Sequence, residues 1–328
     1  MRAICYSKFG EAAEVLALHD VDMPEPQAGE VRVALKFSGV NPSDAKSRRG
    51  SRPGVTKPPF ELVIPHSDGS GVIDAVGAGV DPARVGQRVW IWNGQWQRAF
   101  GTAADAITLP AEQAVKLPDE VSFETGATLG IPGLTAAHTV FGGGDVTRQT
   151  LLISGGAGAV GHNAVQLAKW GGATVIATAS PSAFERVKAA GADHLLDYRA
   201  PDLAGQILAL TEGKGVDRAV EVEFGANVNL LAEVVRANGV ISAYGSQIDL
   251  APTLPFGPLL FKAITIDIAL VYILRPNERA AAVQKLHNAL TAGALVPAVH
   301  DIMPLENAAA AHERVMRAGR NGAVLLKI

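Results

Sequence analysis

The spacing of hydrophobic and polar positions changes once along the chain, near residue 122. Before this point, short apolar runs of strand length alternate with turns that contain Gly and Pro, a pattern typical of β-rich structure. The expected strands cover residues 2–6, 30–37, 71–76, 87–92 and 106–109. After Ser122, apolar positions at helical spacing alternate with short continuous apolar runs. The pattern therefore predicts two different architectures in succession.

The second part of the chain reads as alternating helices and buried strands. Helical patterns cover residues 124–129 and 135–141, with a break at Ile131-Pro132-Gly133. The strands that follow are expected at 150–154, 173–179, 194–198, 217–223, 239–244 and 265–273, the last of them at a sheet edge. Such alternation is typical of a doubly wound parallel sheet.

The end of the chain changes pattern again. A helix is expected at 278–292, and the runs 295–302 and 322–328 resemble strands that return to the first domain. We therefore expect a β-rich domain at 1–122, completed by 275–328. Residues 123–274 would form the α/β domain.

A glycine-rich stretch marks the start of the parallel sheet. The run 150–154 leads into Gly156-x-Gly158-x-x-Gly161, and residues 162–169 continue at helical spacing. In this strand–turn–helix context Gly156 permits a tight turn, Gly158 lets the backbone approach a pyrophosphate, and Gly161 allows helix and strand to pack. The helix N-terminus offers free N–H groups to phosphates. The intervening cofactor-binding residues are Ala157, Ala159 and Val160.

The end of the next strand distinguishes between the two nicotinamide dinucleotides. An NAD site usually places Asp or Glu about 20 residues beyond the first glycine, to bind the ribose 2′-hydroxyl. Here that place reads Thr178-Ala179-Ser180-Pro181, and the first acid is Glu185. Without a carboxylate to repel a 2′-phosphate, and with Ser180 able to donate to it, the sequence favours NADP(H).

Composition excludes several other classes. The 328 residues carry a net charge of −3 with scattered basic residues, which gives no reason to expect a nucleic-acid partner. The two clusters of basic residues, at 46–49 and 314–320, are interpreted as solvated faces. The single cysteine, Cys5, excludes an intramolecular disulfide and a multi-cysteine metal site, and it is expected to be a small buried hydrophobe.

Neither a signal peptide nor a membrane span is expected. The N-terminal residues lack a long apolar core, and the most apolar later run, 264–274, is short and contains Asp267. The sequence therefore predicts a soluble cytoplasmic protein without a membrane partner.

The ordered motifs along almost the whole chain resemble those of a known family, the zinc-free quinone oxidoreductases (ζ-crystallin-like) of the medium-chain dehydrogenase/reductase superfamily. The resemblance implies a GroES-like catalytic domain plus a Rossmann NADP(H)-binding domain, with the active site in the interdomain cleft. It also implies a homodimer formed through the edge strand at 265–273. The matching motifs are Gly39–Asp44, Pro65–Gly71, Val76–Val80, Gly86–Val89, Gly130–Ala136, the glycine loop, Gly191–Asp193, Asp197–Arg199, Asn227–Leu230 and Tyr244–Ser246.

The same resemblance bears on metal binding and on the reaction. Zinc enzymes of the superfamily carry Cys where this chain has Asn41, and His66 falls at their histidine position. Without a thiolate there, we expect no metal, and His66 as a hydrogen-bonded or exposed turn histidine. The implied activity is hydride transfer from NADPH to a quinone. A 2-enoyl or activated-alkene reductase, for example of substituted acrylates, is the alternative enzyme, and a catalytically weak NADPH-binding or structural protein is the other.

Four residues are candidates on the substrate side. The resemblance implies that Asn41 lies beside the nicotinamide and orients the ring or donates to a substrate carbonyl, or else forms a structural Asn-Pro turn. Asp44 is expected to cap a helix. Lys46 replaces a family tyrosine and either donates to a carbonyl, attracts an anionic substrate or is a surface residue. In the Trp-rich segment 90–100, Trp92 and Trp96 either form a stacking wall or simply pack.

The resemblance also places residues around the cofactor. Ser180 and Tyr198 match positions that contact the 2′-phosphate end, whereas the family's phosphate-binding lysine is replaced near Ala183. Arg186 and Arg199 are the candidate substitutes. Further cofactor contacts are expected from Asn41, Thr135, Asn227, Tyr244, Gly245, Ser246, Ala269, Leu270 and Val271.

Overall fold

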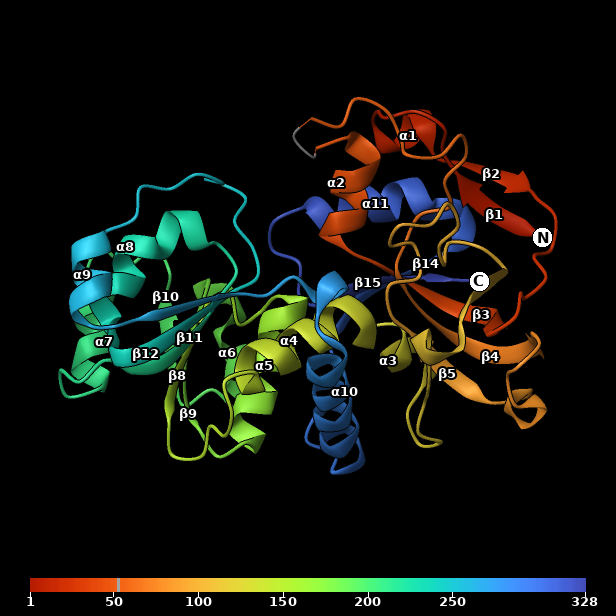
Figure 1. The fold of residues 1–328 in the computed structure, drawn as a ribbon. Helices are drawn as coiled ribbons and strands as arrows, with labels where there is room; N and C mark the ends of the chain where they lie inside the picture. The colour runs from red at the N-terminus through yellow and green to blue at the C-terminus, as the bar shows by residue number, and fades with distance from the viewer. Residues whose placement is uncertain (52–53) are drawn as a thin grey trace. The chain divides into compact units, whose positions relative to one another are not determined.

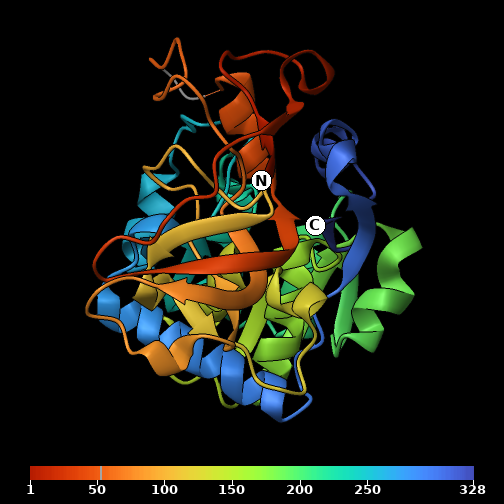
Figure 2. The same ribbon diagram turned by 90° about the vertical axis from the view of Figure 1, so that its right-hand side faces the viewer.

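The computed structural model describes residues 1–51 and 54–328, and the chain divides into two compact units (Figure 1). Unit 1 comprises residues 1–131 and 297–328, and unit 2 comprises residues 132–296. Each is described by itself. Figures 1 and 2 place both chain ends on unit 1.

Unit 1 is built mainly from antiparallel strands, as the alternating pattern predicts. A two-stranded sheet pairs β1 (Arg2–Cys5) with β2 (Ala17–Asp20). The larger, seven-stranded sheet has the order β14-β15-β3-β4-β5-β7, with β6 also paired to β3. Its strands are β3 (Glu30–Val40), β4 (Asp68–Val76), β5 (Arg88–Ile91), β6 (Ala106–Pro110), β7 (Ala114–Lys116), β14 (Val299–Pro304) and β15 (Ala323–Lys327).

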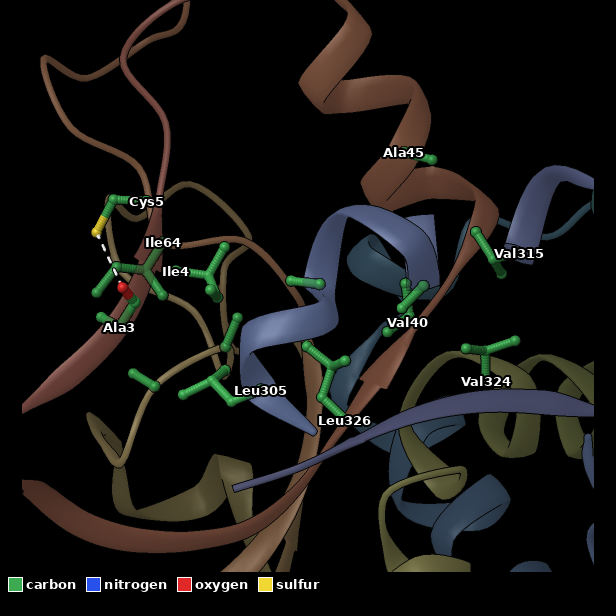
Figure 3. Close-up of a cluster of buried hydrophobic side chains, with 14 residues drawn as sticks. Ala3, Ile4, Cys5, Val40, Ala45, Ile64, Leu305, Val315, Val324 and Leu326 are labelled. Atoms are coloured by element: carbon green, nitrogen blue, oxygen red, sulfur yellow. Dashed lines mark hydrogen bonds between the residues drawn. The ribbon is translucent and has the colours of Figure 1, made fainter. Parts of the chain in front are cut away.

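Short helices cover this unit and close its core. They are α1 (Ala12–Val15), α2 (Pro42–Arg49), α3 (Phe123–Gly126) and α11 (Ala308–Met316). One apolar cluster joins β1, β15, α2 and α11, and Figure 3 shows Cys5 within it. Cys5 is fully buried and burial raises the pKa of its thiol to about 11. The expectation of a small buried hydrophobe is confirmed.

Unit 2 contains one parallel sheet with the order β10-β9-β8-β11-β12-β13. Strand order runs outward from β8 in one direction and from β11 in the other, so the doubly wound prediction is confirmed. The edge position of β13 is confirmed as well. The bounds are β8 (Thr150–Ile153), β9 (Thr174–Ala179), β10 (His194–Asp197), β11 (Val216–Glu221), β12 (Val235–Ala243) and β13 (Thr265–Ile268).

Helices connect these parallel strands (Figure 1). The connecting helices are α5 (Ala159–Trp170), α6 (Phe184–Ala189), α7 (Leu203–Leu210), α8 (Phe224–Val234) and α9 (Phe256–Phe261). Helix α4 (Leu134–Phe141) precedes β8, and α10 (Pro276–Thr291) follows β13. The sequence placed the start of the returning segment at residue 275, before α10. Instead α10 packs on α4 within unit 2, and the chain returns to unit 1 at Pro297. The division into a catalytic and a cofactor domain remains a prediction.

Two local expectations are wrong. The strand predicted at 265–273 stops at Ile268, and residues 271–273 form a 3₁₀ turn. The cluster 46–49 is not a uniformly solvated face, because Arg48 is 0% exposed and packs inward where α2 contacts α11. Its guanidinium donates to the Gly10 carbonyl, and burial lowers its pKa. Across residues 1–51 and 54–328, helices are too short or too polar to cross a bilayer.

Candidate functional site

The glycine loop lies at the point where strand order reverses. It joins β8 to α5, whose N-cap is Gly158. The sequence interpretation assigned the tight turn to Gly156, whereas the left-handed backbone of the turn falls on Gly155, with φ of 68°. Gly156 instead donates its N–H to the Thr178 carbonyl (2.9 Å) of the neighbouring strand.

The three motif glycines meet different surroundings. A Cβ added to Gly161 would lie 2.2 Å from the Gly155 oxygen, so only glycine fits there. At Gly156 a Cβ would come within 3.0 Å of Val187. At Gly158 the nearest protein atom would be 3.4 Å away, which is ordinary contact. Protein packing therefore requires Gly161, whereas the Cα of Gly158 is open to the close approach of a pyrophosphate, and the loop fits a dinucleotide. The Gly158 N–H itself donates to the Gly155 carbonyl at 3.0 Å.

Ser180, Tyr198 and Arg199 gather at the ends of two adjacent strands. Asp197 of β10 pairs with Ala179 of β9, so Ser180 and Tyr198, the next residue of each strand, end side by side. Tyr198 is half-exposed, and the Arg199 guanidinium lies 4.8 Å from the centre of its ring. This cationic and aromatic platform carries the groups that a 2′-phosphorylated adenosine would need.

Arg186 faces elsewhere. Its Nη2 donates to the Ala157 carbonyl at 2.9 Å, and burial lowers its pKa. It lines a pocket that contains neither Ser180 nor Tyr198. Of the two basic candidates for the 2′-phosphate, Arg199 therefore has the better position.

A buried acid occupies the switch point and was missed by the sequence reasoning. Glu221 ends β11 and accepts hydrogen bonds from Ser154 Oγ (2.6 Å) and Asn227 Nδ2 (3.0 Å). Burial raises the pKa of its carboxyl. Asn227 was expected near the nicotinamide, and its amide is at least partly committed to Glu221. A Glu-Val-Glu run at a strand end was the available signal.

Glu223 organises the loop after β12. Its carboxylate accepts from the backbone N–H of Gln247 (2.7 Å) and Ile248 (2.8 Å). Ser246 Oγ bonds the Asp249 carbonyl and receives the Gly225 N–H (2.9 Å). The segment Tyr244–Ser246 therefore follows the strand end as expected, but the Ser246 hydroxyl serves the loop itself.

The remaining predicted cofactor residues also lie at strand ends or on adjoining helices of unit 2. Ala269 follows β13 and donates its N–H to the Ala243 carbonyl at 2.8 Å. Ala269 and Val271 are buried, whereas Leu270 is exposed. Thr135 is buried in α4.

In unit 1, Asn41 is held between two buried carboxyl groups. Its backbone N–H donates to Asp44 Oδ2 (2.7 Å), and its Nδ2 donates to Asp68 Oδ2 (2.8 Å). The Ile131 N–H completes the Asp68 site at 2.8 Å. Burial raises the pKa of Asp44 to about 7, and burial together with the Asp44 charge raises that of Asp68. The capping role expected of Asp44 is confirmed.

The other three substrate-side candidates, Lys46, Trp92 and Trp96, differ in exposure. Lys46 is half-buried on α2, and its ammonium makes no hydrogen bond or ion pair with residues 1–51 or 54–328. Trp96 lines a cavity of about 420 Å³ together with Tyr6, Phe9 and Phe60. Trp92 is only 8% exposed and does not line this cavity. Of the two tryptophans, Trp96 therefore remains the candidate for a stacking wall.

His66 is buried and hydrogen-bonded. Its Nδ1 lies 2.9 Å from Ser38 Oγ, and its Nε2 lies 2.8 Å from Nε2 of His312. Both ring nitrogens are thus committed to protein partners. Within the described ranges, His, Cys, Asp and Glu side chains form no group of three suited to a metal.

Family models match both parts of the chain. The alcohol dehydrogenase GroES-like domain matches residues 27–119, and the zinc-binding dehydrogenase model matches residues 159–288. The quinone oxidoreductase of Rattus norvegicus is 28% identical, over 99% of this chain and 97% of the rat protein. The chloroplast envelope quinone oxidoreductase homolog of Arabidopsis thaliana is 32% identical over 74% of each chain.

Solved structures agree over the full length. A mycobacterial protein complexed with NADPH is 29% identical, with a TM-score of 0.86 and complete coverage of both chains. An NAD-dependent alcohol dehydrogenase is 30% identical, with a TM-score of 0.87 and the same coverage. The resemblance found in the sequence motifs is thereby confirmed. The chain belongs to the quinone oxidoreductase family of the medium-chain dehydrogenase/reductase superfamily and is an oxidoreductase.

Proposed function

We propose that this protein is an NADPH-dependent quinone reductase that works without zinc. The observation that carries the proposal is the glycine loop at the switch point, whose open Gly158 lies one strand away from the Ser180–Tyr198–Arg199 platform. When bound, the nicotinamide supplies a hydride to an electrophilic acceptor. Similarity to quinone oxidoreductases supports the acceptor class.

The preference for NADPH over NADH rests on charge at the strand ends. Ser180 offers a hydroxyl and Arg199 a guanidinium, whereas an NAD site would place a carboxylate after β9. The nearby acid, Asp197, ends β10, and its carboxylate accepts a hydrogen bond from the backbone N–H of Arg199 at 3.0 Å. Hydrogen bonds from Arg to phosphate are strong and charge-assisted. The mycobacterial relative that binds NADPH supports the same choice.

On the acceptor side, the aromatic cavity of unit 1 suits a flat ring. Four of its lining side chains are aromatic, and aromatic rings stack on flat molecules. The Asn41 backbone is fixed by Asp44, and its side-chain amide is oriented by Asp68. This rigidity suits a side chain that orients a ring or a carbonyl.

Zinc independence is supported by side chains that are already committed. His66 uses both ring nitrogens on Ser38 and His312, and the Asn41 amide bonds Asp68. Neither position offers a thiolate. The chain therefore suits acceptors whose developing oxyanion needs only hydrogen-bond donors.

An activated-alkene reductase is the second candidate, and Lys46 is the observation in its favour. Its ammonium has no protein partner in the described ranges and would attract an anionic enone.

The test measures NADPH oxidation with 1,4-benzoquinone and with a 2-substituted acrylate, for wild type, Lys46→Met and the control Lys57→Met. Quinone turnover that survives Lys46→Met supports the first proposal. Turnover of acrylate alone, lost in Lys46→Met, supports the second. NADPH binding with neither acceptor turned over would leave a non-catalytic binding protein.

We also propose a homodimer formed at the β13 edge. Ile268, the last residue of β13, is 77% exposed, and Ile273 in the turn that follows is 64% exposed. An apolar sheet edge is prone to pair with another chain. Light scattering should give twice the chain mass. Ile268→Lys should shift the protein toward the monomer, and a wild-type monomer would contradict the proposal.

A further inference from the structure

Unit 2 contains a cavity of its own, which the proposed reaction does not use. It measures about 550 Å³ and lies against α5, α6 and the segment that follows α10. This volume falls in the range of small-molecule sites. Its polar and aromatic lining consists of His162, Gln166, Lys169, Trp170 and Arg186.

The ionisable side chains of this lining are all basic. Lys169 is paired with Asp193 at 2.6 Å, which offsets its charge. Arg186 forms no ion pair with the described part of the chain, and its hydrogen bond goes to the neutral Ala157 carbonyl. A half-buried guanidinium without a counter-charge favours an anion, and its planar fork fits a carboxylate in two-point contact.

A buried histidine stands beside this cation. His162 is 8% exposed, lines the cavity, and its Nδ1 has no hydrogen-bond partner among residues 1–51 and 54–328. Burial first, and then the Arg186 charge, lower the pKa of His162 to about 4, so the ring is neutral at pH 7. A bound carboxylate would offset the Arg186 charge and raise that pKa.

The rest of the wall is flat and apolar. Trp170 contributes an indole, and Ala189, Ala190 and Val296 contribute small aliphatic surfaces. Gln166 holds the Val296 backbone with two hydrogen bonds, at 3.2 Å and 2.9 Å, which fixes this side of the cavity. An indole beside small aliphatic side chains suits the face of a flat ring.

Arg186 also touches the glycine loop. Its Nη2 donates to Ala157, which lies between Gly156 and Gly158. The first turn of α5 carries His162, whose N–H donates to the Gly158 carbonyl at 2.8 Å. A ligand that binds Arg186 would therefore alter its hydrogen bond to the loop backbone, which we propose to hold the pyrophosphate.

We propose that this cavity is a regulatory site for a small aromatic carboxylate, which binds Arg186 and stacks on Trp170. Its occupancy changes the affinity of the glycine loop for the dinucleotide. Binding of the carboxylate stands by itself, whereas the coupling rests on the proposed function of the loop.

The test titrates 2-naphthoate into the full-length protein, with and without saturating NADPH, by calorimetry. Arg186→Met should lower the affinity at least about tenfold, the effect of one lost charge-assisted contact. Lys188→Met, on the same helix but outside the cavity, should leave it unchanged. Ala189→Phe fills the cavity from an exposed position and should also abolish binding without touching Arg186. Far-UV circular dichroism checks that each variant is folded.

Two further readouts separate the claims. The His162 pKa, followed by NMR, should rise when 2-naphthoate binds. By linkage, 2-naphthoate should change the NADPH affinity by the same factor by which NADPH changes the 2-naphthoate affinity, and this factor should differ from one. Equal 2-naphthoate affinity in wild type and Arg186→Met, or no binding at millimolar concentration, would overturn the site. A ratio of one would overturn the coupling. If the protein does not bind NADPH, the proposed function is contradicted, but the titration of 2-naphthoate without NADPH still tests the cavity.

Discussion

His66 and His312, 246 residues apart, share a hydrogen bond of 2.8 Å between their Nε2 atoms in the buried interior of unit 1. Their rings stack with centroids 5.0 Å apart. The neighbouring hydroxyls determine the direction of the hydrogen bonds. Thr102 Oγ1 donates to the Asp68 carbonyl, so its contact with Ser38 at 2.8 Å requires Ser38 to donate. His66 must then donate from Nδ1 to Ser38, and His312 must donate from Nε2.

We therefore predict opposite tautomers for the two rings. Nitrogen NMR should show His66 protonated at Nδ1 and His312 at Nε2. Burial lowers the pKa of His66 to about 3, and burial, His66 and Arg48 lower that of His312 well below its ordinary value, so both rings should be neutral at pH 7. Ser38→Ala should remove the partner of the His66 N–H and cost about 1–3 kcal/mol. Protonation of His66 at Nε2 would contradict the assignment.

Asp44 predicts a pH dependence of stability. Its folded pKa of about 7 lies above the ordinary value of 3.8, so the folded protein keeps a proton that the unfolded chain releases. This stabilising contribution is complete below pH 3.8 and is lost as pH rises through 7. Relative to Asp44→Asn, wild type should lose at most about 1.4 kcal/mol per pH unit in this window. Urea unfolding from pH 4 to 8 measures the difference, with exposed Asp119→Asn as control. A difference that does not change with pH would refute it.

Gly158 and Gly161 should respond differently to the same added methyl group. Gly161→Ala forces a Cβ against the Gly155 oxygen and should cost about 1–3 kcal/mol with no ligand present. Gly158→Ala meets nothing closer than 3.4 Å and should change stability by less than about 1 kcal/mol. We expect it instead to weaken NADPH binding at least about tenfold. Thermal unfolding and NADPH titration of both variants test this, and equal destabilisation would contradict the assignment.

Arg199 and Arg186 provide a matched pair for cofactor choice. Arg199→Met should remove the cation stacked on Tyr198 and lower the NADPH-to-NADH preference in kcat/KM at least about tenfold. Arg186→Met, whose guanidinium lies on Ala157, should change the affinities for both dinucleotides alike. If Arg186→Met lowers the NADPH preference and Arg199→Met does not, Arg186 is the residue that binds the 2′-phosphate.

Local patterns predicted much of unit 2. The strand–glycine–helix sequence around Gly158 requires only neighbouring residues, so its position, the doubly wound order and the edge strand all followed from spacing. The conformation inside the turn did not, because Gly155 and Gly156 are equally permissive in sequence. Helix α10 was assigned to the wrong side of a boundary, because its packing on α4 depends on residues more than a hundred positions away.

Contacts over long sequence separations explain the other differences. Arg48 lies among Lys46, Ser47 and Arg49, a pattern typical of a solvated helix face, yet contact with α11 buries it. His66 was expected to be either hydrogen-bonded or exposed in a turn, and its partner His312 belongs to a helix near the C-terminus. Glu221 was missed because a buried acid is unusual, and only the fold brings Ser154 and Asn227 to it.

The central claim is tested most directly by the initial rate of 1,4-benzoquinone reduction by the purified protein, measured side by side with NADPH and NADH. We expect turnover with NADPH at least about tenfold faster than with NADH, because Arg199 and Ser180 favour the 2′-phosphate. Equal rates, or faster turnover with NADH, would contradict the interpretation of the strand ends. Absence of turnover with both would contradict quinone reduction itself.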